Sequence, residues 1–386
     1  MQTFNMGRVP PVTFGAGRLQ KLPDIAKSFG DGPVFVVADA VLADLGVTDR
    51  LETQMTQAGL SVGIAAEIAG EPKEALVDAL SERARASGAR VVVGLGGGAA
   101  MDAAKLVAAI AQSGQPAHDF ALAAQPLPGN RLPAIAIPTT AGTGSEVTRT
   151  SVISKADGSK VWFWGEELMF SQAILDPELT LSLPPHLTAW TGIDAVAHAL
   201  EGSTARTTSP AGLLYGLEAL RILSDALPKA IADGSNIELR GRVLWGSMIA
   251  GLALHNCNTH IGHNISHALG SLSRIHHGLA TGLALEVGLP WLVERPEGGQ
   301  NYALAAQALD ANMTAEALPT AFSELMRACG IAKELPRECG EVTSAALAQE
   351  MKNEANVGMS RNAACDVDET GLNELASLMT SMPIAN

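Results

Sequence analysis

Residues 89–105 read ARVVVGLGGGAAMDAAK, an apolar run followed by three glycines and an alanine-rich stretch. The β-branched residues in 89–96 predict a buried strand, and the alanine-rich residues 99–112 predict a helix. Glycines at such a junction let the backbone approach a phosphate closely, and the helix N-terminus offers free N–H groups with a favourable dipole. Residues 94–105 therefore predict either a nucleotide-binding turn or a simple tight turn, and on these residues alone both interpretations carry equal weight.

The alternation of strand and helix continues on both sides of this segment. Short apolar runs predict strands at 33–39, 61–68 and 132–140. Apolar residues at helical spacing predict helices at 41–59 and 73–88. Strands that alternate with helices indicate right-handed crossovers and a parallel sheet covered on both faces. The polar stretch 154–164 predicts a hairpin that turns at Asp157-Gly158.

Strand signals nearly vanish after the proline-bounded segment DPELTLSLPP (176–185). The rest of the chain predicts helices with faces of alanine, leucine and methionine. We therefore expect an α/β domain with a parallel, Rossmann-like sheet at 1–183 and an all-α domain at 184–386.

Composition narrows the class of protein. The chain has 386 residues, 47% hydrophobic and 17% charged, which is typical of a globular protein of two domains. Its net charge of −14 argues against a nucleic-acid partner, because a phosphate backbone needs a basic face. The four cysteines form no CxxC pair, which is typical of reduced thiols. The N-terminus lacks the pattern of a signal peptide. Glu286 and Pro290 interrupt the longest apolar stretch, which is therefore too broken to span a membrane. We expect reduced thiols, no membrane partner and a cytoplasmic location.

Two polar features accompany the glycine turn. Asp39 ends the predicted strand 33–39, and a carboxylate there favours NAD over NADP because it accepts hydrogen bonds from the ribose 2′-OH and repels a 2′-phosphate. The loop PTTAGTGSEVT (138–148) carries hydroxyls on Thr139, Thr140 and Thr143 that can donate to phosphate or ribose oxygens, although a solvated surface loop would look similar. In the Rossmann fingerprint the acid follows the glycines by ~20 residues. Here it precedes them by more than fifty, which leaves the type of nucleotide site open.

Six of the nine histidines lie between residues 255 and 277. Asp194 and His198 are four residues apart and therefore share one helix face, as do His263 and His267, and His277 follows after a short loop. A lone histidine on an apolar face is more often a core residue, but two such pairs and a third segment favour a metal. Carboxylate and imidazole together suit Fe(II) or Zn(II), and the absence of cysteine ligands favours a catalytic site over a structural one.

These segments together resemble the iron-containing (group III) alcohol dehydrogenase family. GLGGGAAMDAAK is similar to the family's GGGSxxDxAK, and PTTAGTGSE is similar to its second loop. ILDPELTLSLPP matches its crossing between domains, and TGIDAVAHALE and HNISHALG with HHG match its two metal segments. The likeness runs almost from end to end, with five blocks in the right order.

The resemblance implies an NAD-dependent oxidoreductase that interconverts a small alcohol and its aldehyde or ketone by metal-assisted hydride transfer. It also implies a dehydroquinate-synthase-like α/β domain, Fe(II) as the favoured metal with Zn(II) as the alternative, and a homodimer or larger homo-oligomer. It assigns the metal to Asp194, His198, His263 and His277, with His267 as a nearby proton relay. It places NAD against Asp39, Gly97, Gly98, Asp102, Thr139, Thr140, Thr143, Lys160 and Leu179.

Two departures from the family pattern prevent the transfer of any substrate. Ala99 stands where the family has serine after the glycines, and Asn362-Ala-Ala-Cys365 replaces an Asn-Pro-Arg segment that tends to line the substrate side. The alternatives are a zinc glycerol dehydrogenase, a metal-free maleylacetate reductase, a lyase of the dehydroquinate synthase type or a silent metal-binding protein. The full ligand set argues against the metal-free and silent options, and Arg274 as the only arginine in the histidine cluster argues against the lyase.

Overall fold

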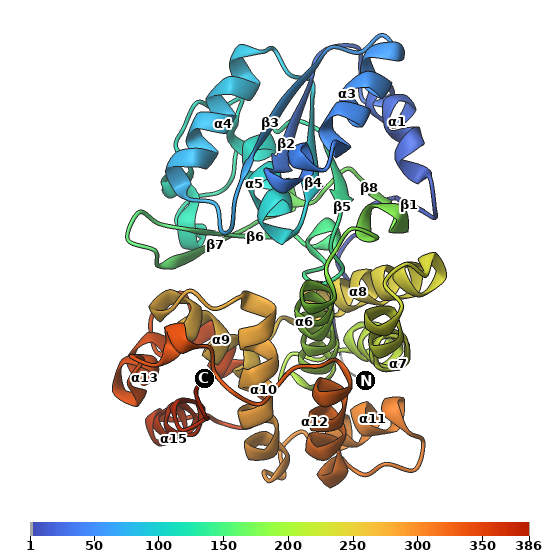
Figure 1. Cartoon of the computed structure of the whole chain (residues 1–386). Coiled ribbons are helices and arrows are strands. Elements are labelled where there is room, and N and C mark those ends of the chain that lie inside the picture. The colour runs from blue at the N-terminus through green and yellow to red at the C-terminus, as the bar shows by residue number, and fades with distance from the viewer. Residues whose placement is uncertain (1–2, 386) are drawn as a thin grey trace. The chain divides into compact units, whose positions relative to one another are not determined.

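The computed structural model describes residues 3–385 and divides into two compact units (Figure 1). The α/β unit comprises Arg8–Thr140 and Ser145–Ser182. The helical unit comprises Met1–Gly7, Ala141–Gly144 and Leu183–Asn386. The middle of the loop 138–148 therefore packs with the helical unit, while both ends of the loop pack with the α/β unit.

A six-stranded sheet in the order β1-β8-β5-β4-β2-β3 forms the α/β unit, and all neighbouring strands are parallel. Its strands are β1 (Val12–Phe14), β2 (Val34–Asp39), β3 (Val62–Ile68), β4 (Val91–Gly96), β5 (Ala134–Pro138) and β8 (Gln172–Leu175). The predicted strands at 33–39, 61–68, 89–96 and 132–140 are confirmed as β2 to β5. The strands β1 and β8 were not predicted.

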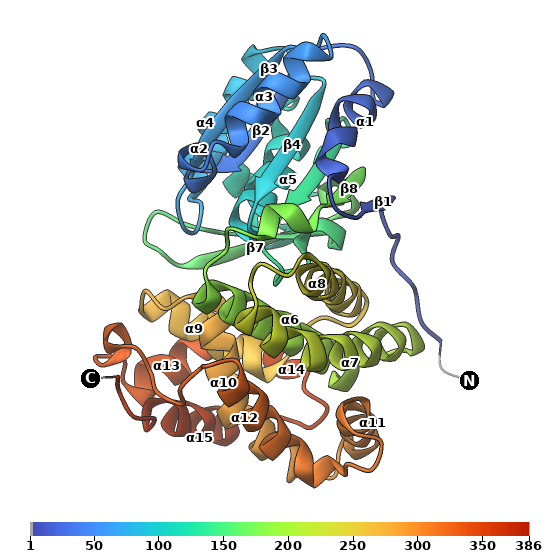
Figure 2. The ribbon, with the colours of Figure 1, turned by 45° about the vertical axis from the view of Figure 1, so that its right-hand side comes forward.

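Helices cover both faces of this sheet (Figure 2). On one face, Val36 of β2 and Val93 of β4 pack in one core with Leu51 of α3 (Val47–Gln57) and with residues of α1 (Leu22–Ser28). On the other face, α5 (Gly98–Ile110) packs on β4, and α4 (Glu74–Ala86) packs on α5. Strands buried on both faces read as continuous apolar runs, which is why the central strands could be predicted.

The remaining parts of the α/β unit are short. The predicted helix 41–59 is interrupted, because α2 (Val41–Asp44) ends before Gly46, whose φ of 65° starts α3. The predicted hairpin is confirmed: β6 (Thr150–Ser154) pairs antiparallel with β7 (Lys160–Trp164), and Gly158 occupies the turn with φ of 91°. The 3-10 turns are η1 (Arg18–Lys21), η2 (Ala117–Ala123), η3 (Ser145–Val147), η4 (Glu166–Leu168) and η5 (Pro177–Thr180).

In the helical unit, α6 (Pro185–Thr204) packs against α7 (Pro210–Ala232), α8 (Ile237–Cys257) and α10 (His277–Val293). The helix α9 (Ile261–Leu272) packs on α10. Because α6 is enclosed by its neighbours, its residues from Gly192 to Thr204 are all buried. The other helices are α11 (Gly299–Leu309), α12 (Leu318–Ala328), α13 (Ser344–Met351), α14 (Val357–Arg361) and α15 (Glu369–Thr380), with η6 (Ala315–Ala317) and η7 (Arg337–Cys339).

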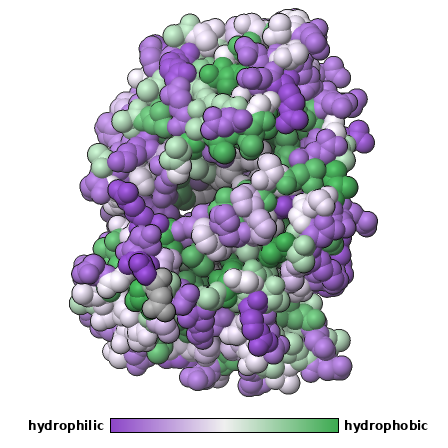
Figure 3. All heavy atoms as spheres, in the orientation of Figure 1, coloured by the Kyte–Doolittle hydropathy of each residue, from purple (hydrophilic) through white to green (hydrophobic). Residues whose placement is uncertain are grey.

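Both expected architectures, a parallel sheet with helices followed by an all-helical region, are confirmed. Figure 3 shows hydrophilic and hydrophobic residues interspersed over one face of the molecule. Among residues 3–385, no helix combines the length and the apolar character needed to cross a membrane.

Candidate active site

The turn between β4 and α5 is built around Gly96 and Gly97. Gly96 has φ of 148°, and a Cβ at this residue would lie 2.4 Å from Asp39 Oδ2 and 2.8 Å from Ala100 Cβ. Glycine is therefore required here by conformation and by space. Gly97 precedes α5, and Gly98 is the first residue of the helix, where backbone N–H groups have no partner within the helix.

Asp39 lies directly beside this turn. The strands β2 and β4 are adjacent and parallel, with Ala38 opposite Leu95, so the end of β2 meets the end of β4. Asp39 Oδ2 accepts a hydrogen bond of 2.7 Å from Gly97 N. Burial raises the pKa of the Asp39 carboxyl to about 6, and the bond from Gly97 partly offsets that effect. Strand order in the sheet thus brings together an acid and a glycine turn that are more than fifty residues apart.

The other residues predicted around NAD lie in several places. Thr139 N donates to Gly96 O at 2.9 Å, and Thr140 Oγ1 is 3.4 Å from the position of a Cβ on Gly97. Both threonines are therefore beside the glycine turn. Thr143 belongs to the segment Ala141–Gly144 of the helical unit, Lys160 at the start of β7 pairs with Glu71 at 3.2 Å, and Leu179 packs on the core of the sheet.

Asp102 has both carboxylate oxygens engaged inside the α/β unit. Its Oδ1 accepts from Ser145 Oγ at 2.6 Å, and its Oδ2 accepts from Val152 N at 2.8 Å. Lys105 Nζ lies 3.8 Å from Oδ1 and donates to Thr148 Oγ1 at 3.0 Å. Asp102 therefore ties α5 to η3 and β6.

Two buried charged residues in this network were not predicted from the sequence. Lys105 and Glu146 are 1% and 3% exposed. Burial lowers the pKa of Lys105 to about 8, although Asp102 and Glu146 act in the opposite direction. Burial raises the pKa of Glu146 to about 7. The lysine of the GLGGGAAMDAAK segment was visible in the sequence, but nothing there indicated its burial.

The predicted metal ligands converge in the helical unit. Asp194 Oδ1 lies 3.7 Å from His263 Nε2 and 3.5 Å from His277 Nε2, and His198 Nε2 lies 3.0 Å from His263 Nε2. One ligand atom each from Asp194, His263 and His277 falls within 4.8 Å of the others. Asp194 Oδ1 is buried and accepts no hydrogen bond from any residue that the structure describes. A buried carboxylate oxygen facing imidazole nitrogens fits a divalent metal of the iron or zinc type.

Three helices bring these four side chains together. Asp194 and His198 occupy one face of α6, His263 lies in the first turn of α9, and His277 opens α10. The start of α10 approaches α6 closely at Gly278, where a Cβ would lie 2.1 Å from Trp190 O.

His267 lies one turn after His263 on α9. Its ring centroid is 6.2 Å from that of His263 and 5.2 Å from that of His277, and the side chain is half-buried. His267 therefore adjoins the metal cluster. Among the described residues, the group of converging ligand atoms contains neither His267 nor His198, but His198 Nε2 lies 3.0 Å from His263 Nε2.

The ligands also have partners on their outer side. His198 Nδ1 lies 3.2 Å from Gly142 O, and burial lowers the pKa of His198. His263 Nδ1 lies 2.5 Å from Glu201 Oε2. Burial of Glu201 favours its protonated form, but the charges of His260 and His263 and the hydrogen bonds from both residues outweigh burial and hold its pKa at about 2. Glu201 was not predicted from the sequence, although its position seven residues after Asp194 places it on the same face of α6.

His260, His276 and Asn362 make contacts within the helical unit that are separate from the cluster of predicted ligands. His260 is buried, with Nε2 3.0 Å from Thr204 Oγ1, and His276 packs on the Trp190 ring at 5.2 Å. Asn362, in the segment that departs from the family pattern, donates from Nδ2 to Cys257 O and Thr259 O at 2.9 and 3.0 Å.

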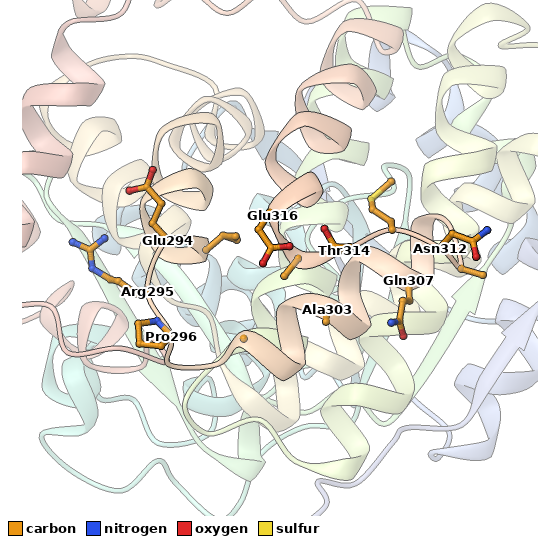
Figure 4. Close-up of a pocket in the computed structure, with 13 residues that line it drawn as sticks. Glu294, Arg295, Pro296, Ala303, Gln307, Asn312, Thr314 and Glu316 are labelled. Carbon is orange, nitrogen blue, oxygen red and sulfur yellow. The ribbon is translucent and has the colours of Figure 1, made fainter.

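A cavity of about 610 Å³ lies in another part of the helical unit (Figure 4). Its lining comes from the end of α10, from α11 and from the residues around η6, and includes Glu294, Arg295 and Glu316. None of the residues predicted for the cofactor or the metal lines it.

A parallel sheet with a glycine turn beside an acid, and a helical unit with an Asp-His₃ cluster, together define the class of metal-dependent, nucleotide-linked dehydrogenases. The sequence model of the protein family described as "Iron-containing alcohol dehydrogenase" matches residues 10–177. The sequence model of the family described as "Fe-containing alcohol dehydrogenase family, C-terminal" matches residues 188–367. The chain belongs to the iron-containing alcohol dehydrogenase family.

Similar proteins include the Long-chain-alcohol dehydrogenase 1 of Geobacillus thermodenitrificans, 36% identical over 284 residues, or 72% of this chain and 70% of that protein. The Sulfoacetaldehyde reductase of Bilophila wadsworthia is 33% identical over 273 residues, 70% of either chain. Among solved structures, the sulfoacetaldehyde reductase of Bifidobacterium kashiwanohense in complex with NAD+ has a TM-score of 0.89 and 28% identity, and the match covers 99% of this chain and 100% of that one. The chain is thus an NAD-dependent, iron-type oxidoreductase that interconverts an alcohol and its aldehyde or ketone.

Proposed function

We propose that Asp194, His198, His263 and His277 hold the catalytic metal of this alcohol dehydrogenase, with Fe(II) preferred over Zn(II). The observation that carries the assignment is the buried Asp194 Oδ1, which lies 3.5 and 3.7 Å from two imidazole nitrogens and accepts no hydrogen bond from residues 3–385. When bound, the metal supplies a Lewis acid toward the substrate oxygen, and NAD accepts or supplies the hydride.

We propose that the α/β unit binds NAD along the glycine turn. Gly97 lets the pyrophosphate approach the backbone closely, and the N–H groups from Gly98 onward at the start of α5 donate to it. Gly97 N itself donates to Asp39 Oδ2, and the Asp39 carboxylate also accepts from the ribose hydroxyls. Within the α/β unit, hydroxyl, ammonium and apolar side chains complete the site, namely Thr139, Thr140, Lys160 and Leu179. Asp102 serves this site indirectly. Its carboxylate accepts hydrogen bonds from Ser145 Oγ and Val152 N and so holds the end of the loop 138–148 in place.

We propose that His267 holds the proton released when the alcohol is oxidised and returns it when the carbonyl is reduced. Its half-buried ring beside His277 supports this role. His267→Asn should lower the turnover number by about 10²–10⁴-fold while the metal content stays at one per chain. Loss of bound metal in this variant would instead identify His267 as a ligand.

The metal assignment is tested by aldehyde-dependent NADH oxidation over a panel of small aldehydes and ketones. Chelator-stripped protein should be inactive, and anaerobic Fe(II) should restore activity. His198→Ala should lose both metal and activity. The matched control, His186→Ala, removes an exposed histidine from the same helix and should retain both. Equal activity with and without metal would refute the metal mechanism and favour the metal-free alternative.

We also propose a cytoplasmic homodimer. All four cysteines are buried free thiols, and burial raises the pKa of Cys329 to about 12, as expected for inert thiols in a reducing compartment. The strand β1 is an edge strand whose outer backbone groups can pair with a second copy. Light scattering should give twice the 39.9 kDa of one chain, and a mass of one chain would contradict the dimer.

A further inference from the structure

Glu201 joins two helices beside the metal cluster through a single carboxylate. It lies on α6, three residues after His198, and its side chain is 0% exposed. Its Oε1 accepts from Gly262 N at 2.6 Å, and its Oε2 accepts from His260 N at 3.1 Å. The same Oε2 lies 2.5 Å from His263 Nδ1.

The contacts with the backbone cap α9 from outside that helix. The first N–H groups of a helix have no partner within it, and His260 at the N-cap provides no side-chain cap of its own. A carboxylate at a helix N-terminus satisfies these donors and also interacts favourably with the helix dipole. Glu201 therefore fixes where α9 begins and, with it, the position of His263.

The contact with the imidazole fixes the tautomer of His263. A carboxylate can only accept, so the proton of the neutral ring must sit on Nδ1. The lone pair then remains on Nε2, the nitrogen that lies 3.7 Å from Asp194 Oδ1 and 3.0 Å from His198 Nε2. The wrong tautomer would place an N–H bond toward the other ligands.

Resting on the metal site proposed above, we propose that Glu201 is a positioning residue for the metal. Its carboxylate fixes the start of α9 and holds the Nδ1–H of His263, so that Nε2 is presented to the ion as a preformed ligand. Outer partners of this kind orient a ligand and raise its basicity, and their loss typically weakens metal affinity by about 10–100-fold.

Glu201→Gln tests the proposal because the amide has the same shape as the carboxylate, but its NH2 group donates where a carboxylate oxygen accepted. Whichever way the amide turns, a donor now faces either the backbone N–H groups of α9 or the Nδ1–H of His263. Glu286→Gln is the matched control: this buried carboxylate on α10 accepts from Ser323 Oγ at 2.5 Å and pairs with Lys333 at 3.0 Å, and it is not among the contacts of the metal cluster.

The measurement is the Zn(II) dissociation constant by competition with a chromophoric chelator, together with the absorption spectrum of the Co(II)-loaded protein. For Glu201→Gln we expect a dissociation constant about 10–100-fold higher and altered cobalt bands. Glu201→Asp, which keeps the charge but shortens the reach, should also bind more weakly. Glu286→Gln should match the unmodified protein in both readouts. Wild-type affinity and spectrum in folded Glu201→Gln, or wild-type affinity in Glu201→Asp, would overturn the positioning role.

Two further results separate this inference from the proposed metal site. If His263→Ala binds Zn(II) as tightly as the unmodified protein, the ligand assignment fails and the role of Glu201 fails with it. If the Glu201 variants do not fold, ¹⁵N-histidine NMR of the unmodified Zn(II)-loaded protein decides. A protonated Nδ1 and a metal-bound Nε2 on His263 support the proposal, and ligation through Nδ1 refutes it.

Discussion

The substitution Glu146→Gln should make the protein more stable, and by more at high pH than at low pH. Glu146 is 3% exposed, and burial raises its pKa from 4.5 to about 7. The folded state therefore binds the proton more tightly than the unfolded chain, and stability falls as the pH rises from 4.5 to 7. The difference between a pKa of 4.5 and one of about 7 corresponds to about 3 kcal/mol of free energy of unfolding, which is lost as the pH rises through 7. Glutamine has the same shape and pays no such cost.

Urea unfolding followed by circular dichroism measures this effect. We expect the variant to exceed the unmodified protein by about 3 kcal/mol at pH 8 and by under about 1 kcal/mol at pH 5. Glu52→Gln, an exposed glutamate on α3, is the matched control and should show no difference that depends on pH. The reasoning is refuted if Glu146→Gln is less stable at pH 8. That outcome would mean that Lys105 stabilises the ionised carboxylate by more than burial destabilises it.

Three other substitutions have defined outcomes. Asp39→Ala should increase kcat/KM for NADP+ relative to kcat/KM for NAD+ by at least about tenfold, because it removes a negative charge that would repel the 2′-phosphate. An unchanged ratio would contradict the proposal that Asp39 selects NAD. Gly96→Ala should weaken NAD binding measured by calorimetry, because the new Cβ would lie 2.4 Å from Asp39 Oδ2. Gly88→Ala is the control and should leave NAD binding unchanged, because Gly88 also has positive φ but has open space around it. Arg240→Met should lower the free energy of unfolding by about 2–5 kcal/mol and with it the melting temperature. The buried guanidinium donates to Leu183 O and Gly234 O, and both carbonyls would lose these donors. An unchanged melting temperature would show that these bonds contribute little.

The central sheet was predictable because burial on both faces leaves a plain signature. β2 and β4 consist almost entirely of buried residues, and each is followed by helical sequence. β1 and β8 have only three and four residues, and they pair with each other across a long separation, Val12 opposite Ala173. Such short strands show no periodicity of their own, so β1 at the edge of the sheet and β8 beside it could come only from the tertiary structure.

The candidate site was predictable where one helix or one loop carries several of its residues. The spacing of Asp194 and His198 fixes a shared face of α6 before any packing is known. The burial of Lys105 and Glu146 and the closeness of Gly278 to α6 depend on other segments, so the local sequence carries no signal for them. Asp39 was partly predictable: the sequence shows an acid at the end of a strand, but only the strand order shows that this acid reaches the glycine turn.

Asn362 shows how hydrogen bonds can change the interpretation of a motif. The segment Asn362-Ala-Ala-Cys365 suggested the substrate side by resemblance, yet the Asn362 amide donates to Cys257 O and Thr259 O. These carbonyls flank Asn258, whose φ of 59° and ψ of 179° are typical of glycine and costly for other residues. The amide therefore holds a strained connection between α8 and α9, the helix that carries His263. An asparagine at this position is explained by the placement of α9 and His263, and it needs no contact with substrate.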